Sequence, residues 1–455
     1  MIHLVFDGLA KVLTKKLYWV IITKKFALQI EGGVRVDRFA LINATVFVGN
    51  GSIVEKGVVL VEKGRIVKVG KSQSISIPAD FTKIDLSDRF LMPGLIDAHL
   101  HLTGMRSGDS IKEHLLVPYE TLVARAVKDL ESLINAGFTT IADAGGSIAV
   151  NLKKAVQEKT ILGPRIVAAG HSLSQTFGHG DAHYLPIDYV DPRNSKFKTP
   201  FGSLICDGVD ECRKAARYAL RCGADFIKIM STGGVLSERD RPEYIQFTRE
   251  EIEAIVQEAR HANKFVHAHA QGTEGIKNAL LAGVKVIAHG IYIDEECCEI
   301  AKKLDAIVVP TLSIVEHIMR YGREIGIPEW GLKKSEEVYR AHVENIKLAY
   351  QRGVKLATGT DFLGGVKAFK QGDNALEIVL FVEKLGMKPE EALISATKIA
   401  AEAVGLAKQV GTIEEGKFAD LIVLNENPIE NVETLLNEKN VSLVVKEGEI
   451  VKKTI

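Results

Sequence analysis

Short apolar runs and amphipathic stretches alternate through the central part of the chain. Each apolar run has the length and Val/Ile content of a buried strand, and most are followed by apolar positions at helical spacing. The predicted strands cover residues 95–102, 139–144, 165–170, 226–231, 265–270, 284–290, 307–311 and 355–361. This α/β alternation favours a closed parallel (β/α)₈ TIM barrel over an open doubly wound sheet. No predicted strand is followed by the glycine fingerprint of a dinucleotide site.

Two of the helix starts carry local sequence signals. Thr248 and Glu251 have the spacing of a capping box, and Ile252 and Ile255 lie on one face behind them. Another helix is predicted to begin at Lys388-Pro389, since proline is favoured at the first helical position.

The two ends of the central region have a different, all-β character. Residues 39–92 and 410–455 both consist of short Val/Ile-rich runs broken by glycine turns. We expect one small β-sandwich domain formed from both termini, with residues 93–409 as the barrel. Residues 1–38 are predicted to be an extension. Its longest apolar run, 17–22, is too short to span a bilayer, and the order of a signal peptide is missing.

The amino-acid composition limits where in the cell the protein is expected and which macromolecules it is expected to bind. The 58 basic and 58 acidic side chains cancel and are scattered, which gives no case for nucleic acid or for an anionic membrane. The five cysteines have no paired spacing, which fits a reducing compartment and predicts a cytoplasmic protein.

Histidines occur in pairs on two of the predicted strands. His99 and His101 in "LIDAHLHLTG" are two residues apart and share one face, as do His267 and His269 in "KFVHAHAQG". Two imidazoles facing a barrel lumen are difficult to explain as packing, whereas they are good metal ligands. His269 is nearer the catalytic end of its strand, and His267 is expected to be a supporting or packing residue.

Two further polar residues end predicted strands at the same rim. His289 ends "VKVIAHG" and Asp361 ends "VKLATGTD". Either alone would be weak evidence, because an isolated Asp there is often only a turn or helix cap. Beside the histidines, Asp361 becomes a candidate metal ligand and general base.

Lys228 lies in the middle of the buried strand of "GADFIKIMSTGG". A lysine is almost never fully buried without a partner. It could form a buried ion pair, act as a Schiff-base nucleophile, or lose its charge and carry a CO₂-derived carbamate that bridges two metal ions. The third explanation accounts for the histidines and Asp361 with one site.

Together these motifs resemble those of the amidohydrolase superfamily from about Phe39 onward. The matching segments are "MPGLIDAHLHL", "HAQGTEGI", "AHG", "TGTD" and "GTIEEGKFADLIVL". The resemblance implies a (β/α)₈ barrel with a β-sandwich from both termini. By motif position it implies the following metal ligands: His99, His101, Lys228 as a carbamate, His269, His289 and Asp361. One departure is local, because the motif on the fifth strand often reads HAHG in the superfamily and reads HAQG here.

Residues 206–252 resemble the branch of Xaa-Pro dipeptidases and imidazolonepropionase-like amidohydrolases, which includes carboxypeptidase-like dipeptidases. The implied function is hydrolysis of an amide C–N bond in a dipeptide or other small molecule, by a homo-oligomer. Two divalent ions, expected to be Zn²⁺, would bridge a hydroxide, and Asp361 would act as general base and acid. The alternative is a mononuclear cyclic-amide hydrolase or deaminase, against which Lys228 argues. A catalytically dead scaffold is a third interpretation, although all six ligand positions are filled.

Two loops are expected to face the substrate. The loop after the third strand contains His179 and His183, and the loop after the fourth contains Arg239, Arg241 and Tyr244. His179 and Tyr244 are candidates to hydrogen-bond the substrate and its developing oxyanion. Arg239 or Arg241 could bind a terminal carboxylate. The competing interpretation is that these are ordinary solvated loop residues.

Overall fold

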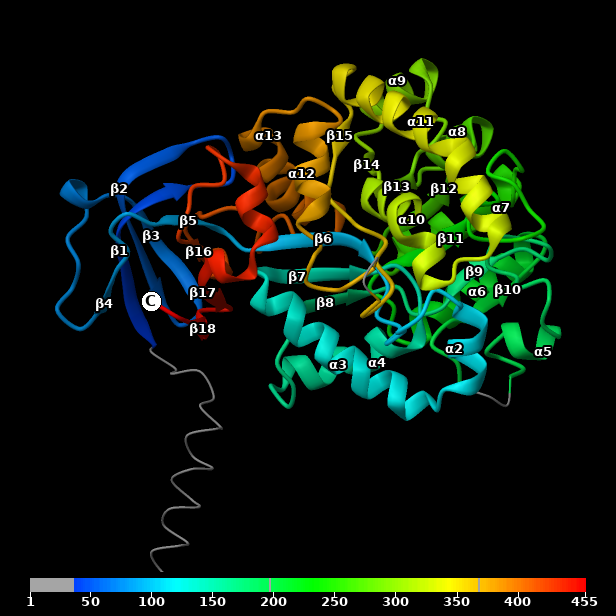
Figure 1. Ribbon diagram of the computed structural model, residues 1–455, viewed down its shortest axis with the longest axis horizontal. Coiled ribbons are helices and arrows are strands. Elements are labelled where there is room, and N and C mark those ends of the chain that lie inside the picture. Colours follow the sequence, from blue (N-terminus) through cyan, green and yellow to red (C-terminus); the bar gives the residue numbers. More distant parts are fainter. Residues whose placement is uncertain (1–36, 196–197, 367–368) are drawn as a thin grey trace, which may run out of the picture.

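A computed structural model describes residues 37–195, 198–366 and 369–455. The predicted N-terminal extension lies outside the described residues, apart from its last two positions. The described chain forms a mixed sheet at one side and a larger α/β body at the other (Figure 1).

Strands from both ends of the chain form the mixed sheet. Its order is β18-β17-β16-β5-β1-β2-β3, with β4 paired to β1. The two ends meet where β16 pairs antiparallel with β5, for example Leu421 with Pro93. The alternate positions of these strands bury a separate apolar core, which the pattern of short Val/Ile-rich runs predicts. The strands are β1 Arg38–Phe47, β2 Ile53–Glu62, β3 Arg65–Lys71, β4 Thr82–Asp85, β5 Phe90–Pro93, β16 Leu421–Leu424, β17 Val441–Lys446 and β18 Glu449–Lys453.

The α/β body is TIM-barrel-like and is built on parallel strands. All eight predicted strands are present: β6 Leu95–Leu100, β7 Phe138–Asp143, β8 Arg165–Ala168, β11 Ile227–Met230, β12 Val266–Ala270, β13 Val286–His289, β14 Ile307–Val309 and β15 Lys355–Leu356. The sequence did not predict β9 Ser172–Ser174 and β10 Ser203–Ile205, which pair beside β11.

Hydrogen bonds connect the two parallel sheets at both edges. The Ala98 amide donates to the Thr358 carbonyl at 2.9 Å, which links β6 to the segment after β15. The Asp225 amide donates to the Ala168 carbonyl at 2.8 Å, which links β8 to the segment before β11. The carboxyl ends of strands far apart in sequence therefore lie together.

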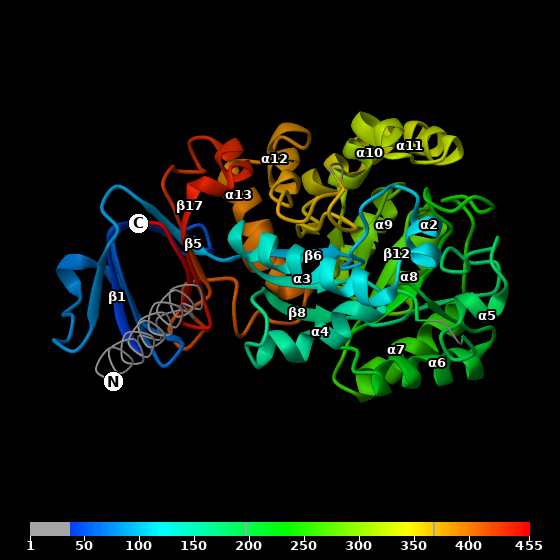
Figure 2. The ribbon, with the colours of Figure 1, turned by 60° about the horizontal axis from the view of Figure 1, so that its bottom comes forward.

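Helices lie on both sides of these strands in the turned view (Figure 2). They are α2 Ser110–Leu116, α3 Tyr119–Asn135, α4 Ser147–Gln157, α5 Ile187–Val190, α6 Val209–Arg221, α7 Arg249–His261, α8 Thr273–Leu281, α9 Glu295–Lys303, α10 Leu312–Ile325, α11 Glu329–Gln351, α12 Leu376–Glu383, α13 Pro389–Ile394 and α14 Ala400–Ala403. Both predicted helix starts are confirmed: Thr248 and Glu251 form the capping box of α7, and α13 begins at Pro389. In the described ranges, no helix is both long enough and apolar enough to span a membrane.

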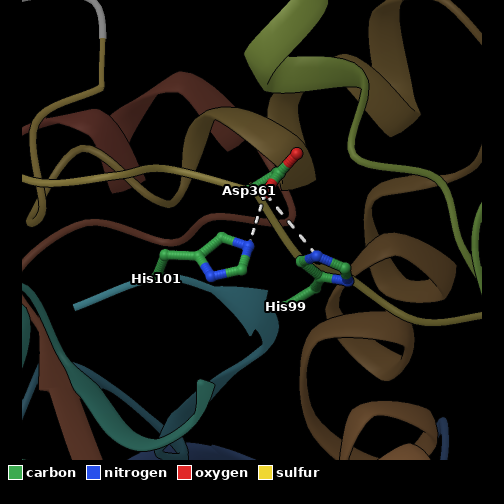
Figure 3. Close-up of side chains that lie close together, drawn as sticks. All are labelled: His99, His101 and Asp361. Atoms are coloured by element: carbon green, nitrogen blue, oxygen red, sulfur yellow. Dashed lines mark ion pairs between the residues drawn. The ribbon is translucent and has the colours of Figure 1, made fainter. Parts of the chain in front are cut away.

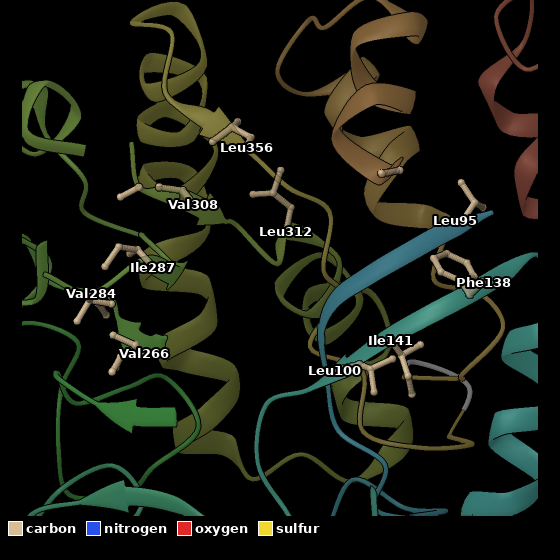
Figure 4. Packing of buried hydrophobic residues seen from close by; sticks show 14 of the residues in the cluster. Leu95, Leu100, Phe138, Ile141, Val266, Val284, Ile287, Val308, Leu312 and Leu356 are labelled. Carbon is tan, nitrogen blue, oxygen red and sulfur yellow. The ribbon is translucent and has the colours of Figure 1, made fainter. Parts of the chain in front are cut away.

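The central strands bury side chains on both faces. Figure 4 shows Val266, Ile287, Val308 and Leu356 from four neighbouring strands, all members of the main apolar cluster. Ile227 and Ile229 belong to the same cluster, so Lys228 between them points to the opposite face of β11. This alternation directs the one charged side chain of the strand away from the helices.

Candidate metal centre

His99, His101 and Asp361 converge at the carboxyl ends of β6 and β15 (Figure 3). Asp361 Oδ1 lies 3.2 Å from His101 Nε2 and 3.6 Å from His99 Nε2. The Asp361 amide donates to the His99 carbonyl at 2.7 Å, so the two segments are also joined through their backbones. Two imidazoles and a carboxylate within 4.8 Å of one another form a ligand set suited to a divalent metal ion.

His269 and His289 line the same cavity as this cluster. The ring centroids of His99 and His289 are 5.2 Å apart, and those of His269 and His289 are 4.7 Å apart. Burial lowers the pKa of His99, His269 and His289 well below the usual value, and the neighbouring Lys228 lowers each further. The neutral imidazoles that result are the form that binds metal.

The other ring nitrogens of these histidines are occupied in a way that suits metal binding. His101 Nδ1 lies 2.8 Å from the Gly145 carbonyl, and His289 Nδ1 lies 2.7 Å from Thr311 Oγ1. His269 instead uses Nε2, which lies 3.0 Å from the Gly233 carbonyl. When a backbone carbonyl accepts the N–H of one nitrogen, the lone pair of the other is free to coordinate. The donor set therefore fits a metal.

The His267 side chain contacts the His99 ring. Its Nε2 lies 3.1 Å from His99 Nδ1, and the side chain is almost fully buried. With the Nδ1–H of His99 donated to His267, His99 Nε2 faces Asp361 with its lone pair free. The contact fits the supporting role that the sequence predicts for His267.

Lys228 is 1% exposed, and its Nζ lies 3.4 Å from His99 Nε2. Within the described ranges no carboxylate lies at ion-pairing distance from this amine. Burial lowers the pKa of Lys228 to about 8, against the opposing influence of Asp361 and Asp143. The ammonium form is thus disfavoured at the place where the sequence predicts a modified lysine.

Two of the cluster's residues have left-handed backbones. His289 has φ 71° and Asp361 has φ 58°, and Thr311, which contacts His289, has φ 56°. Such values are uncommon for residues other than glycine and cost free energy. The left-handed conformation of His289 also interrupts the alternation of side chains along β13. Ala288 is paired with His269, so regular alternation would point the His289 side chain to the opposite face of the sheet. The interrupted alternation lets the His289 side chain reach the cavity.

A buried polar network that the sequence did not predict holds β6 and the Asp361 segment together. Asp97 accepts the His99 amide at 3.0 Å and the Thr360 hydroxyl at 2.8 Å. Asn374 Nδ2 donates to Asp97 at 2.7 Å and to Thr360 at 3.1 Å. Asp97 shares the parity of His99 and His101, and that signal could have identified it.

Removing the Asn374 amide is expected to weaken this network. Asn374→Leu should lower the free energy of unfolding by about 1–3 kcal/mol, because a buried carboxylate loses a donor. Chemical denaturation of the purified protein measures the effect. Asn151→Leu is the matched control: Asn151 is exposed on α4 and bonds only locally, so a change below about 0.5 kcal/mol is expected. Equal effects of the two substitutions would contradict the structural role of Asn374.

The predicted loop residues divide into two groups. His179 and His183 line the cavity, and His179 stacks on His269 with centroids 4.1 Å apart. Its Nδ1 lies 2.8 Å from Ser237 Oγ, which in turn contacts the buried Asp240. Arg239, Arg241 and Tyr244 are exposed and are not among the cavity-lining residues. Their contact with substrate stays a prediction.

The geometry agrees with the comparison to known proteins. The family model of the amidohydrolase family matches residues 90–451. This chain belongs to the amidohydrolase family. The resemblance that the sequence motifs indicate is therefore confirmed, and family membership supports metal-dependent hydrolysis of amide bonds.

Individual relatives of this amidohydrolase belong to the expected branch. An ochratoxinase of Aspergillus niger is 36% identical over 374 residues, which cover 80% of this chain and 75% of the relative. A crystal structure of a Xaa-Pro dipeptidase with bound methionine in its active site has a TM-score of 0.81 at 32% identity, covering 91% of this chain and all of that one (100%). An imidazolonepropionase of Methylobacterium nodulans is 24% identical over 414 residues, which cover 84% of this chain and 90% of the relative.

Proposed function

We propose that this amidohydrolase is a metallo-dipeptidase that hydrolyses the amide bond of a dipeptide or an N-acyl amino acid. The observation that carries the proposal is the convergence on one cavity of one carboxylate, four imidazoles and a buried amine that has no carboxylate partner among the described residues. The solved Xaa-Pro dipeptidase and the prolidase complexed with N-methylphosphonate-L-proline, both above 30% identity, support this substrate class.

The proposed site holds two divalent ions, which we expect to be Zn²⁺. His99, His101, His269, His289 and Asp361 would ligate them, and Lys228 would bridge them as a carbamate. Ions bound there would polarise the substrate carbonyl and would lower the pKa of a water molecule.

The protein's own groups have distinct roles in this proposal. Asp361 takes the proton of the attacking water and later delivers it to the leaving amine. His179 is held at Nδ1 by Ser237, so its Nε2 is available to the carbonyl oxygen as negative charge develops.

The test is a screen of dipeptides and N-acyl amino acids with protein that is loaded with Zn²⁺ and supplied with bicarbonate. We expect release of free amino acid from some members and none from chelated protein. If no member is hydrolysed by the loaded protein, the dipeptidase proposal is wrong.

A second candidate function is a mononuclear cyclic-amide hydrolase or deaminase. It is favoured by the fact that the three most closely convergent side chains, His99, His101 and Asp361, could hold one ion by themselves. Metal analysis separates the two candidates: about two ions per chain support the dipeptidase, and about one supports the alternative.

We also propose that the parallel strands close a complete (β/α)₈ barrel over residues 93–409. Residues 39–92 and 410–455 would form the β-sandwich around the eight-stranded sheet. The hydrogen bonds that link the parallel sheets at both edges support closure. A cytoplasmic location, which the cysteine content motivates, and assembly as a homo-oligomer belong to the same proposal.

A further inference from the structure

A left-handed turn of two residues ends β13 beside the candidate metal centre. His289 has φ 71° and Gly290 has φ 62°. Glycine adopts this conformation at little cost, whereas for a histidine it costs free energy. The direction of the His289 side chain depends on the turn, because regular alternation would point the imidazole to the other face of the sheet. Contacts with the surrounding structure must therefore stabilise the turn.

Two side chains of α11 make hydrogen bonds to this turn. His342 Nε2 lies 3.1 Å from the His289 carbonyl. Asn345 Nδ2 donates to the Ile291 carbonyl at 2.9 Å. The two side chains are three positions apart, so they lie on one face of the helix. Together they hold the carbonyl groups on both sides of Gly290.

The His342 ring is a hydrogen-bond donor at Nε2. A carbonyl oxygen can only accept, so the contact with His289 requires the proton on Nε2. Burial lowers the pKa of His342 to about 4, although the His289 and Pro310 carbonyls favour the protonated ring. The ring is thus neutral near pH 7, and its Nδ1 carries no proton. Nδ1 is buried and has no hydrogen-bond partner among the described residues.

A histidine at this position is poorly suited to packing alone. His342 is 1% exposed, and its buried neighbours on the same helix include Val338, Ile346 and Ala349. An apolar side chain there would leave no buried nitrogen unpaired, and an unpaired buried polar atom costs free energy. What the imidazole supplies, and an apolar side chain would not, is the hydrogen bond to the His289 carbonyl.

We propose that His342 is a positioning residue for the metal centre, which holds the left-handed backbone of His289 through its carbonyl and is assisted by Asn345. The inference rests on the proposed metal site and assigns to α11 the support of one ligand. Thr311 orients the His289 ring at Nδ1, whereas His342 acts on the backbone. Without the His342 donor, the segment is free to relax toward an ordinary strand conformation, which turns the imidazole away from the other candidate ligands.

The test measures the Zn²⁺ affinity of metal-free protein by competition with a chromogenic chelator. His342→Met and His342→Gln form a matched pair, because the two side chains have similar length and only glutamine carries an N–H donor. His342→Met is expected to weaken the binding of one ion about tenfold, as the loss of a group that holds a metal ligand commonly does. His342→Gln is expected to keep the affinity within about threefold of wild type.

The same substitution in a His289→Ala background shows whether His342 acts through His289. With the ligand already removed, His342→Met is expected to change the remaining Zn²⁺ affinity by less than about twofold. A substitution that only loosens the fold would weaken binding in both backgrounds. Three results each overturn the proposal: an unchanged affinity in His342→Met, an equal loss in His342→Gln, or an equal loss in the His289→Ala background.

Circular dichroism of the metal-free variants shows whether each one folds. If His342→Met does not fold, Asn345→Leu replaces it, because Asn345 is less buried, and it must also weaken Zn²⁺ binding. An unchanged affinity in Asn345→Leu then overturns the proposal. A wild-type protein that binds no Zn²⁺ refutes the proposed metal site and this inference with it, whereas unchanged binding in the variants refutes the positioning role alone.

Discussion

Asp361→Asn is expected to lower kcat/KM on the best amide substrate by about a thousandfold while the fold is kept. Asparagine has nearly the same shape, and the Asp361 amide still donates to the His99 carbonyl. What is lost is the carboxylate that faces both His99 and His101 Nε2, and with it the group that accepts and returns a proton. Steady-state kinetics measure the effect, and metal analysis of the same sample shows how far ligation contributes.

Asp373→Asn is the matched control for this substitution. Asp373 lies on the same segment after β15, and among the described residues its carboxylate has a single ion pair, at 3.5 Å with the surface residue Lys370. Surface pairs of this kind contribute little, so turnover within about twofold of wild type is expected. Near-wild-type turnover of Asp361→Asn with its full complement of metal would show that Asp361 is not the proton-transfer group.

The strands and the rim of the site could be predicted from sequence because each depends on local information. An apolar run marks a strand, and in a parallel barrel all strand ends meet at one rim. The sequence alone therefore predicts one rim that carries His99, His101, His269, His289 and Asp361. Lys228 was recognisable because its charge conflicts with the burial of Ile227 and Ile229 on either side.

The rest of the site depends on contacts that no local pattern encodes. Asn374 contacts Asp97 across 277 residues of chain, and only the fold shows that they are neighbours. The left-handed backbone of His289 directs its side chain against the alternation that the sequence implies. Loop residues are the hardest to predict: His179 reaches the cavity and Arg239 does not, although both lie in polar loops after strands.

Lys228→Met is expected to abolish activity and to stabilise the metal-free protein at the same time. Methionine fills the space of the lysine stem but cannot carry a carbamate. We therefore expect kcat/KM to fall by at least about a thousandfold and the metal content to drop from about two ions per chain to about one. Without metal, the wild-type protein buries an amine next to His99 with no ion-pair partner in the described ranges. Replacing a poorly compensated buried charge with an apolar side chain commonly stabilises a fold, here by about 1–4 kcal/mol.

The two effects separate a functional lysine from a structural one. Lys355→Met on β15 is the matched control, because Lys355 pairs with Glu402 at 2.7 Å and Asp305 at 2.8 Å near the surface. Its loss should leave activity and metal content unchanged and should not stabilise the protein. Reconstitution of metal-free wild-type protein with Zn²⁺ adds a direct test of the carbamate: activity should return with bicarbonate present and should stay low in CO₂-free buffer. Two results would show that the lysine is not the bridge between the metals. One is a Lys228→Met protein that keeps both ions and full turnover. The other is an equal return of activity with and without bicarbonate.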